Sequence, residues 1–289
     1  MQIFFKIKET KELIKKWKAE GYSIGFVPTM GYLHEGHTSL IERARAENDK
    51  VVVSIFVNPT QFAPSEDLDS YPRDLEKDKD LCDKAGADLI FHPDTSEMYP
   101  DSSCTFVDMY KVSKELCGKS RPTHFRGVCT VVNKLFNIIE PDKAYFGQKD
   151  AQQLAVIKRM VNDLNINTEI VDCPIIREED GLAKSSRNIY LNEKERSAAL
   201  ILQKALIKSG DMIIEGERSS EILIETMRNI INSEPLAKID YIEIVNNDTI
   251  EKINIIDLSK NEVLVAVAVF IGKTRLIDNF ILKSLWRDK

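Results

Sequence analysis

Short apolar runs alternate with helix-like segments over the first part of the chain. The predicted strands are residues 23–27, 51–57, 88–91, 143–146 and 168–171. The predicted helices are residues 8–20, 38–45, 73–85, 128–139 and 151–163. The run 51–57 is almost continuously apolar, as expected of a strand buried on both faces of a parallel sheet. This alternation predicts an α/β fold with a doubly wound, Rossmann-like parallel sheet.

The pattern changes after Pro174. The predicted elements of this part are helices 193–209 and 220–231, followed by strands 240–245, 263–271 and 275–282. Because strands follow helices here without alternation, we expect a separate and smaller α+β domain. We therefore divide the chain into domains 1–175 and 176–289. Residues 94–119 have no clear period, and we assign no element to them.

Composition and charge limit the possible function. The chain has 289 residues, of which 43% are hydrophobic and 30% charged, as in ordinary soluble globular proteins. Its formal net charge of −6 argues against broad nucleic-acid binding, which needs a basic face. The longest apolar run, residues 263–271, is much shorter than a membrane-spanning helix. The early charges argue against a signal peptide, and five scattered cysteines without a C-x-x-C pair favour reduced thiols in a cytoplasmic protein.

The stretch 26–37 gives the strongest indication of chemistry. It leaves a predicted strand, passes two glycines and enters a predicted helix, for which Thr38 or Ser39 is the expected N-cap. A helix start has orphan N–H groups and a partial positive charge, and it therefore favours phosphate. His34 and His37 are three residues apart, so both rings can lie on one side of the helix start. There they could donate to phosphate oxygens whose charge grows during transfer.

Two other motifs are absent from this stretch. A zinc protease needs His-Glu-x-x-His, but Thr38 stands at the fifth position. The glycines at 31 and 36 lack the spacing of the dinucleotide fingerprint, which argues against a nicotinamide or flavin enzyme. Gly36 instead lets a base or a phosphate approach the backbone between the histidines. A surface turn whose histidines have no function is the alternative interpretation.

A second set of groups suited to phosphate follows the predicted domain boundary. Residues 184–187 read Lys-Ser-Ser-Arg and offer two cations, two hydroxyls and backbone donors. By itself this is a common surface turn. Together with His34 and His37, it indicates that two distant loops bind one triphosphate.

These loops and the residues between them resemble the pantothenate synthetase (pantoate–β-alanine ligase) family of the nucleotidyltransferase superfamily, to which class I aminoacyl-tRNA synthetases also belong. The matching segments are residues 27–31, 33–37, 57–62, 71–73, 121–125, 146–153 and 185–188. Their combination is highly specific, whereas the C-terminal part adds no motif of its own. Two positions depart from the residues frequent in the family: Lys184 replaces a Met, and Gln148 replaces a Glu.

The resemblance implies an ATP-dependent ligase of pantothenate and coenzyme A biosynthesis. In this family ATP adenylates (R)-pantoate and releases pyrophosphate. The amine of β-alanine then attacks the pantoyl-adenylate to give pantothenate and AMP. The resemblance further implies Mg²⁺ accompanying ATP and a homodimer, while the charge, the short apolar runs and the cysteines predict a cytoplasmic protein with no nucleic-acid or membrane partner. Domain 1–175 would bind nucleotide and pantoate, and domain 176–289 would be a lid that carries residues 184–187.

The same resemblance assigns site residues. The residues expected at ATP are Met30, Gly31, Tyr32, Leu33, His34, Glu35, Gly36, His37, Gly147, Gln148, Lys149, Asp150, Ile176, Lys184, Ser185, Ser186 and Arg187. Those expected to take part in catalysis are His37, His34, Lys149 and Arg187. Gln61 and Gln153, assisted by Asn58, are expected at pantoate and β-alanine, because neutral amides suit a substrate with hydroxyls and a carboxylate. Asp78 is the candidate ligand for Mg²⁺, although the ion can instead arrive bound to ATP.

Several alternatives stay open. A plain adenylyltransferase shares the His-x-Gly-His loop but does not require Gln61 and Gln153. A tRNA synthetase fragment is disfavoured by the negative charge and the lack of an anticodon-binding domain. A nucleotide sensor would bind ATP without forming AMP. Residue by residue, Gln153 could be a helix-surface residue and Asp150 an N-cap, and His124 and Arg126 could either line the pocket or belong to a structural loop.

Overall fold

The computed structural model describes residues 1–64, 66–260 and 262–283. Contacts between Cα atoms divide the chain into two compact units. The first unit comprises residues 1–110, 121–148 and 156–176, and the second comprises 111–120, 149–155 and the described residues from 177 onward. The main change of unit falls after Ile176, and two short earlier segments belong to the second unit. Each unit has its own sheet.

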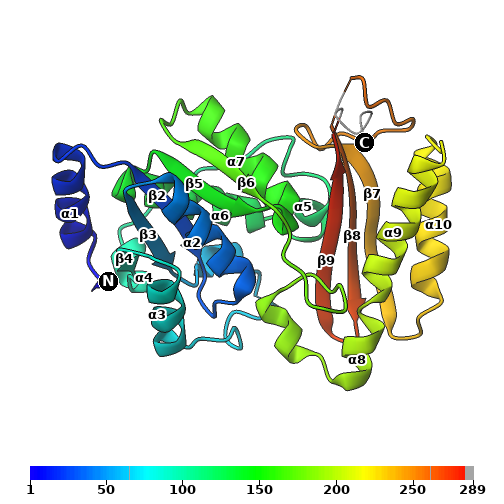
Figure 1. Cartoon of the computed structure of the whole chain (residues 1–289), viewed down its shortest axis with the longest axis horizontal. Helices are drawn as coiled ribbons and strands as arrows, with labels where there is room; N and C mark the ends of the chain where they lie inside the picture. The colour runs from blue at the N-terminus through cyan, green and yellow to red at the C-terminus, as the bar shows by residue number, and fades with distance from the viewer. Residues whose placement is uncertain (65, 261, 284–289) are drawn as a thin grey trace. The chain divides into compact units, whose positions relative to one another are not determined.

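Within the described residues, the first unit contains a six-stranded parallel sheet in the order β1-β4-β3-β2-β5-β6 (Figure 1). Its strands are β1 (Gln2–Phe4), β2 (Ile24–Thr29), β3 (Lys50–Ile55), β4 (Leu89–Phe91), β5 (Lys143–Gly147) and β6 (Glu169–Cys173). The predicted doubly wound parallel sheet is confirmed. The prediction lacks β1, because an edge strand of three residues is too short to have a detectable period.

Helices cover both faces of this sheet. They are α1 (Ile7–Ala19), α2 (Glu35–Glu47), α3 (Leu75–Lys84), the short α4 (Thr95–Met98), α6 (His124–Ile139) and α7 (Ala151–Asp163). Right-handed crossovers place α2 and α3 on one face and α1 and α6 on the other (Figure 1). Val27, Ile41, Val53 and Cys82 belong to the core on the α2 side. Of the helices that the structure describes, none is both long enough and apolar enough to span a membrane.

Pro28 lies inside β2, although the sequence indicates that the strand breaks there. β2 pairs with β3 as far as Thr29, but its ladder with β5 ends at Phe26. The carbonyl of Thr29 accepts from the N–H of Phe56, so odd-numbered residues of β2 face β3. The backbone nitrogen of Pro28 therefore faces β5, beyond the last paired residue of that ladder. Because no ladder hydrogen bond forms at this position, the lack of an N–H in proline costs none. In the described sheet, the carboxyl ends of β2 and β5 do not pair.

Two helices differ from the predicted boundaries. α6 begins at His124 and not at Val128, because the glycine in its first turn lowers helix propensity and hides the start. The predicted helix 193–209 is two helices, α8 (Glu193–Ala198) and α9 (Ile201–Ile214). No glycine or proline marks the change of direction between them, so the sequence has no stop signal there.

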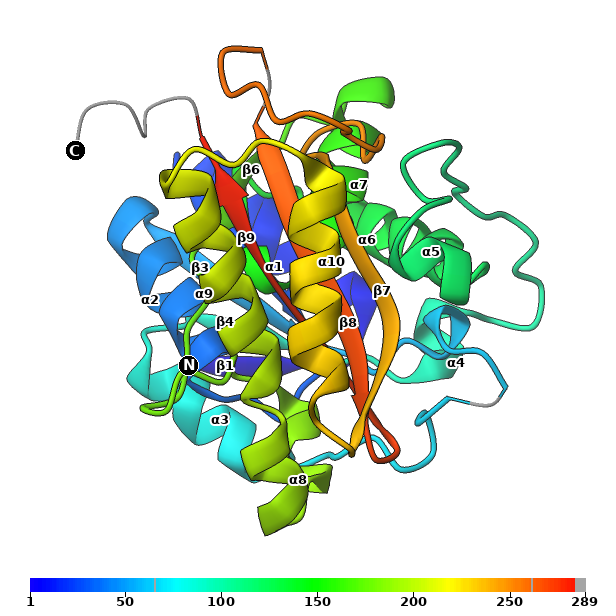
Figure 2. The same ribbon diagram turned by 90° about the vertical axis from the view of Figure 1, so that its right-hand side faces the viewer.

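The second unit contains, among its described residues, a three-stranded antiparallel sheet in the order β7-β8-β9. Its remaining elements are the short α5 (Cys117–Ser120), α10 (Ser220–Asn232), β7 (Ala237–Asn246), β8 (Val263–Ile271) and β9 (Thr274–Leu282). Figure 2 shows α9 and α10 side by side over one face of this sheet. Alternate residues of β8, among them Val265 and Val267, pack in the core with Leu202 of α9 and Leu223 of α10. The smaller α+β part is confirmed.

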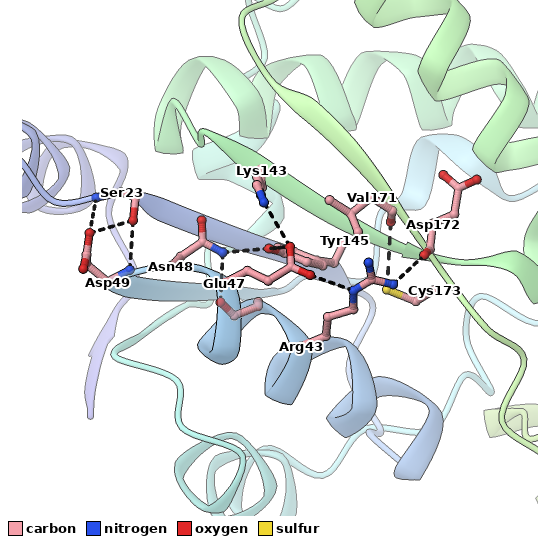
Figure 3. A network of polar contacts seen from close by, with 11 residues as sticks. Ser23, Arg43, Glu47, Asn48, Asp49, Lys143, Tyr145, Val171, Asp172 and Cys173 are labelled. Atoms are coloured by element: carbon pink, nitrogen blue, oxygen red, sulfur yellow. Dashed lines mark hydrogen bonds and ion pairs between the residues drawn. The ribbon is translucent and has the colours of Figure 1, made fainter.

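A network of polar side chains ties the carboxyl end of α2 to β5 and β6 (Figure 3). Glu47 accepts from Nε of Arg43 at 3.0 Å, from Nζ of Lys143 at 3.1 Å and from the phenol of Tyr145 at 3.0 Å. Arg43 also donates to the carbonyl of Asp172 in β6 at 2.9 Å. The hydrogen bonds from Arg43 and Lys143 lower the pKa of Glu47 from 4.5 to about 2. The helix that follows the candidate phosphate loop is therefore fixed at its far end.

We expect Glu47→Gln to lower the melting temperature at neutral pH by roughly 1–4 °C, because a partly exposed ion pair is worth up to about 1 kcal/mol. A carboxyl with a lowered pKa in the folded chain stabilises it above pH 4.5, and this contribution is lost as the pH falls towards 2. The difference from the wild type should therefore shrink in calorimetric melts as the pH is lowered. Glu42→Gln, at an exposed position of the same helix, is the control. A difference independent of pH would contradict this account.

Candidate functional site

The carboxyl ends of β2 and β5 lie where open α/β sheets bind ligands. β3 pairs with one side of β2 and β5 with the other, so the topological switch point lies between β2 and β5. Met30 follows β2 directly, and Gln148 follows β5. Two of the segments predicted to bind nucleotide, 30–37 and 147–148, thus begin at this edge of the sheet.

A buried carboxylate shapes the loop after β2. Oδ2 of Asp78 accepts from the N–H of Tyr32 at 2.8 Å, and Oδ1 accepts from the N–H of Leu33 at 2.6 Å. Asp78 is only 1% exposed, so water does not compete for these bonds. The turn is left-handed at Gly31 (φ 85°) and at Tyr32 (φ 51°), and a Cβ at Gly31 would lie 2.9 Å from Cγ2 of Ile55. The loop therefore needs glycine at 31 and an acceptor at 78.

These contacts give Asp78 a structural role, and its ligation of a metal ion stays a prediction. Burial raises the pKa of its carboxyl, and the two hydrogen bonds from backbone N–H groups oppose that rise. In the part of the chain that the structure describes, no group of three or more His, Cys, Asp or Glu side chains is placed to hold a metal ion. The side chains present therefore do not by themselves fit an Mg²⁺ site.

α2 begins at Glu35, so the expected N-caps Thr38 and Ser39 are wrong. The N-cap is His34, whose Nδ1 accepts from the N–H of Gly36 at 3.1 Å. The acceptor of this cap is an imidazole nitrogen, whereas N-caps usually accept through a hydroxyl or carboxylate oxygen. The hydroxyls of Thr38 and Ser39 donate to the carbonyls of Glu35 and Gly36, at 3.2 and 3.0 Å. The two histidines thus belong to the first turn of the helix and not to a loop before it.

The same contacts determine which ring nitrogens carry protons. Nδ1 of His37 accepts from the N–H of His34 at 3.4 Å, a long contact that completes a reciprocal cap. A backbone N–H can only donate, so in each neutral ring Nδ1 is the acceptor and Nε2 carries the proton. The ring centroids are 4.1 Å apart. Two imidazoles with Nε2–H donors therefore lie side by side at the positive end of a helix dipole, an arrangement suited to an anion.

A buried amide orients Gln61. Oδ1 of Asn58 accepts from Oγ1 of Thr60 at 2.9 Å, and its Nδ2 donates to the carbonyl of Gly127 and to Oε1 of Gln61, both at 3.1 Å. Nε2 of Gln61 then points to Sδ of Met30, at 3.1 Å. Asn58 is 1% exposed, and its amide is used by protein partners. Any contribution of Asn58 to pantoate binding therefore passes through Gln61.

The first turns of α6 pack directly against the turn 58–61. Nδ1 of His124 lies 2.9 Å from the carbonyl oxygen of Gln61, so this histidine has a structural contact. A Cβ at Gly127 would lie 2.4 Å from the carbonyl oxygen of Thr60 and 2.6 Å from the backbone nitrogen of Gln61. Neither backbone atom can move without displacing the turn. Glycine at 127 therefore permits the approach of α6 to the turn that carries Gln61.

Two adjacent glutamines in the second unit have different surroundings. Gln152 is 5% exposed, and its Nε2 donates to the carbonyls of Val112 and Glu115 at 3.0 and 2.7 Å. Its Oε1 accepts from the N–H of Cys117 at 2.9 Å. Gln152 thereby fixes this earlier segment to the start of α7. Gln153, the residue predicted to bind pantoate, is half-buried at the next position of the helix.

Lys149 and Asp150 lie in the short turn η2 (Gln148–Asp150) that leads into α7. The carbonyl of Lys149 accepts from Nδ2 of Asn279 in β9 at 2.9 Å, which fixes the backbone at this position. The side chain of Lys149 is half-buried, and Asp150 is exposed.

The segment 184–187 follows a firm anchor within the second unit. Arg177 forms a bidentate ion pair with Asp278 of β9, with N–O distances of 2.7 and 3.0 Å. Asp278 is 3% exposed, and a buried bidentate pair of this kind is strongly directional. Oγ of Ser185 accepts from the N–H of Arg187 at 3.3 Å and caps the 3₁₀ turn that follows. The residues predicted to bind phosphate thus lie on and next to a short, capped 3₁₀ turn.

The predicted site residues fall in both units. Those of the first unit are residues 30–37, Asn58, Gln61, Asp78, Gly147, Gln148 and Ile176. Those of the second unit are Lys149, Asp150, Gln153 and residues 184–187. Within the first unit, the structure brings His34 to His37 and Gln61 to Met30. That both sets bind one triphosphate stays a prediction.

Sequence reasoning misses three contributors to the site. These are Gly127, the anchoring role of Asp78, and Tyr99, whose phenol donates to Oδ1 of Asn58 at 2.9 Å. Tyr99 lies in the segment that has no period, and its partner is 41 positions away in the chain. No local spacing signals such a contact.

Comparison with known proteins gives a consistent result. The family model described as pantoate-beta-alanine ligase matches residues 2–281. Over 274 residues the chain is 61% identical to the pantothenate synthetase of Ruminiclostridium cellulolyticum, covering 95% of this chain and 96% of that one. Over 283 residues it is 59% identical to the pantothenate synthetase of Clostridium botulinum, covering 98% and 100%.

Solved structures agree with this similarity. The crystal structure of pantothenate synthetase from Thermus thermophilus matches with a TM-score of 0.91 at 42% identity, covering 97% of this chain and 99% of that one. Pantoate-beta-alanine ligase from Francisella tularensis, complexed with beta-gamma ATP and beta-alanine, matches with a TM-score of 0.78 at 37% identity, covering 97% of each chain. The resemblance found in the sequence is therefore confirmed, and the chain belongs to the pantoate–β-alanine ligase family.

Proposed function

We propose that the protein is an ATP-dependent ligase that condenses (R)-pantoate with β-alanine and releases AMP and pyrophosphate. Its family membership supports the overall reaction. The observation that carries the proposal is the first turn of α2, where His34 and His37 cap the helix and both present Nε2–H donors. The complex of the Francisella tularensis relative with beta-gamma ATP and beta-alanine supports the same substrates here.

The reaction requires position and positive charge more than covalent help from the protein. In the first step, a carboxylate oxygen of pantoate bonds to the α-phosphorus, and the bond from that phosphorus to the bridging oxygen breaks, so pyrophosphate leaves. In the second step, the amine nitrogen of β-alanine bonds to the acyl carbon and loses a proton, and AMP leaves with the electron pair of the broken C–O bond. The attacking carboxylate and the phosphates are both negative, and charge builds on the bridging oxygen as it leaves, so neutralising donors lower the barrier.

His37 donates from Nε2 to an oxygen of the α-phosphate as charge builds there, and His34 donates to a neighbouring phosphate. Their donors are preorganised, because backbone N–H groups hold Nδ1 of both rings as acceptors. The dipole of α2 adds partial positive charge at the same place.

Gln61 and Gln153 bind pantoate. Oε1 of Gln61 is engaged by Asn58 and one N–H of its Nε2 by Sδ of Met30, so Gln61 offers the second N–H of Nε2 to an oxygen of the substrate. A neutral amide donor holds a carboxylate or hydroxyl without removing the negative charge that the nucleophile needs.

Mg²⁺ enters with the nucleotide. The carboxylate of Asp78 accepts from two backbone N–H groups, so phosphate oxygens and water would be the main ligands of the ion. When bound, it neutralises part of the charge on the phosphates.

From the second unit, the cations of Lys149 and Arg187 bind the phosphates of the same ATP. The hydroxyls of Ser185 and Ser186 donate to these phosphates. In this proposal, domain 1–175 holds nucleotide and pantoate, and domain 176–289 is the lid. Lys184 stands at the start of this loop, and Ile176 lies near the adenine. We further propose a homodimer that works in the cytoplasm, as the family resemblance implies.

Release of AMP with ATP, Mg²⁺, pantoate and β-alanine tests the proposal. We expect AMP only when all four are present, and pyrophosphate exchange into ATP when β-alanine alone is omitted. Exchange that depends on a phosphate ester and not on pantoate would indicate an adenylyltransferase. Binding of ATP without any AMP would indicate a nucleotide sensor, and either result would reject the ligase.

We expect His37→Ala to slow AMP release by about 10²–10³-fold, because it removes a donor to charge that develops in the transition state. The effect should fall on kcat more than on the KM values, and the melting temperature should stay close to that of the wild type. Unchanged turnover in a folded variant would remove His37 from the mechanism.

Asp78→Asn tests the loop that precedes α2. An amide turns an N–H donor toward one of the two backbone N–H groups, and a buried donor without an acceptor costs about 1–3 kcal/mol. We expect a lower melting temperature and a raised KM for ATP, measured by calorimetry and AMP release. Asp80→Asn, at an exposed position of the same helix, should change neither. Equal behaviour of the two variants would contradict the anchoring role of Asp78.

A further inference from the structure

Tyr99 lies just after α4, in the segment to which the sequence assigns no element. Its hydroxyl donates to Oδ1 of Asn58 at 2.9 Å and lies 3.4 Å from Oγ1 of Thr60. Its ring packs beside Phe56, with centroids 6.3 Å apart, and Nζ of Lys134 lies 5.6 Å from the ring centroid. Burial raises the pKa of the phenol, so the hydroxyl keeps its proton at neutral pH and remains a donor.

Backbone groups decide which way the amide of Asn58 faces. The carbonyl of Gly127 can only accept, so the group 3.1 Å from it is Nδ2. The N–H of Thr60 can only donate, so the group 3.4 Å from it is Oδ1. Tyr99 and Oγ1 of Thr60 both donate to the same Oδ1 at 2.9 Å, a much shorter distance than that of this backbone N–H. The phenol therefore strengthens the orientation that the backbone selects.

The orientation of the Asn58 amide determines that of the Gln61 amide. Nδ2 of Asn58 donates to Oε1 of Gln61, so the other end of the Gln61 amide must be Nε2. A flipped Asn58 would place an acceptor against Oε1 and would force Gln61 to turn its own oxygen toward the ligand. The end of Gln61 that meets the substrate would then change from donor to acceptor. An oxygen-rich anion would lose a hydrogen bond and gain a repulsive contact.

We infer that Tyr99 is a positioning residue which, through Asn58, holds Gln61 as an N–H donor toward the substrate anion and thereby sets the preference of this pocket for oxygen acceptors. The inference rests on the proposed function, because it assigns pantoate to Gln61. In this inference Tyr99 acts through Asn58, and the relay Tyr99–Asn58–Gln61 lies entirely within the first unit.

A double-mutant cycle of AMP release tests the relay with Tyr99→Phe, Gln61→Ala and the double variant. Phenylalanine keeps the ring and removes only the hydroxyl. We expect Tyr99→Phe to raise the KM for pantoate about tenfold and leave the KM for ATP unchanged, since one buried hydrogen bond is lost. In the Gln61→Ala background the same change should have less than about a twofold effect, because the residue through which it acts is gone.

The control is Tyr110→Phe, which removes a phenol hydroxyl from a side chain that is 78% exposed. It should leave both KM values unchanged. A fully structural role of Tyr99 would lower the melting temperature and act equally in both backgrounds. Equal effects with and without Gln61, a shift in the KM for ATP alone, or no effect would each overturn the inference.

Asn58→Asp is the second variant, needed if Tyr99→Phe does not fold. Aspartate still accepts from the phenol, but it has no donor for Oε1 of Gln61, so the relay breaks after its first bond. We expect the KM for pantoate to rise as in Gln61→Ala, with no further rise in the double variant. An unchanged KM for pantoate would overturn the inference. Wild-type protein that forms no AMP would instead reject the proposed function, which keeps the two failures distinct.

Discussion

Two hydrogen bonds, from the backbone N–H groups of Tyr32 and Leu33 to the buried carboxylate of Asp78, fix the loop between β2 and α2. They hold the chain in a left-handed turn just beyond the sheet, so that α2 begins at Glu35 with its first N–H groups at the switch point. A single buried acceptor on α3 thus fixes the backbone directly before His34, the N-cap of α2.

α2 is held at both ends. At its start, the rings of His34 and His37 accept backbone N–H groups, and at its end Glu47 joins Lys143 and Tyr145 (Figure 3). These partners of Glu47 lie on β5, the strand on the other side of the switch point from β3. The helix therefore spans the point where the two halves of the sheet separate. Rigid placement of this kind suits a reaction in which position and charge lower the barrier.

The sequence is a good guide where the signal is local. The apolar runs of β3 and β8 predict their strands, because burial on both faces produces such runs directly. The start of α2 is misplaced, because the usual cap preferences favour Thr38 and Ser39 over an imidazole. The supporting contacts could not be predicted at all. Asp78 binds Tyr32 across 46 positions, and an acidic helix face gives no sign of which carboxylate turns inward once the sheet has formed.

Gly127 has a consequence for the design of variants of this enzyme family. Within a helix, glycine is less favourable than alanine by about 1 kcal/mol, so a survey of helix propensities would mark this position for replacement. The methyl group would meet the backbone of Thr60 at 2.4 Å, however, and push on the strand-end turn that carries Gln61. Helix propensity and the close packing of α6 on the turn 58–61 make opposite demands at this position, so a search for more stable variants should keep glycine at 127.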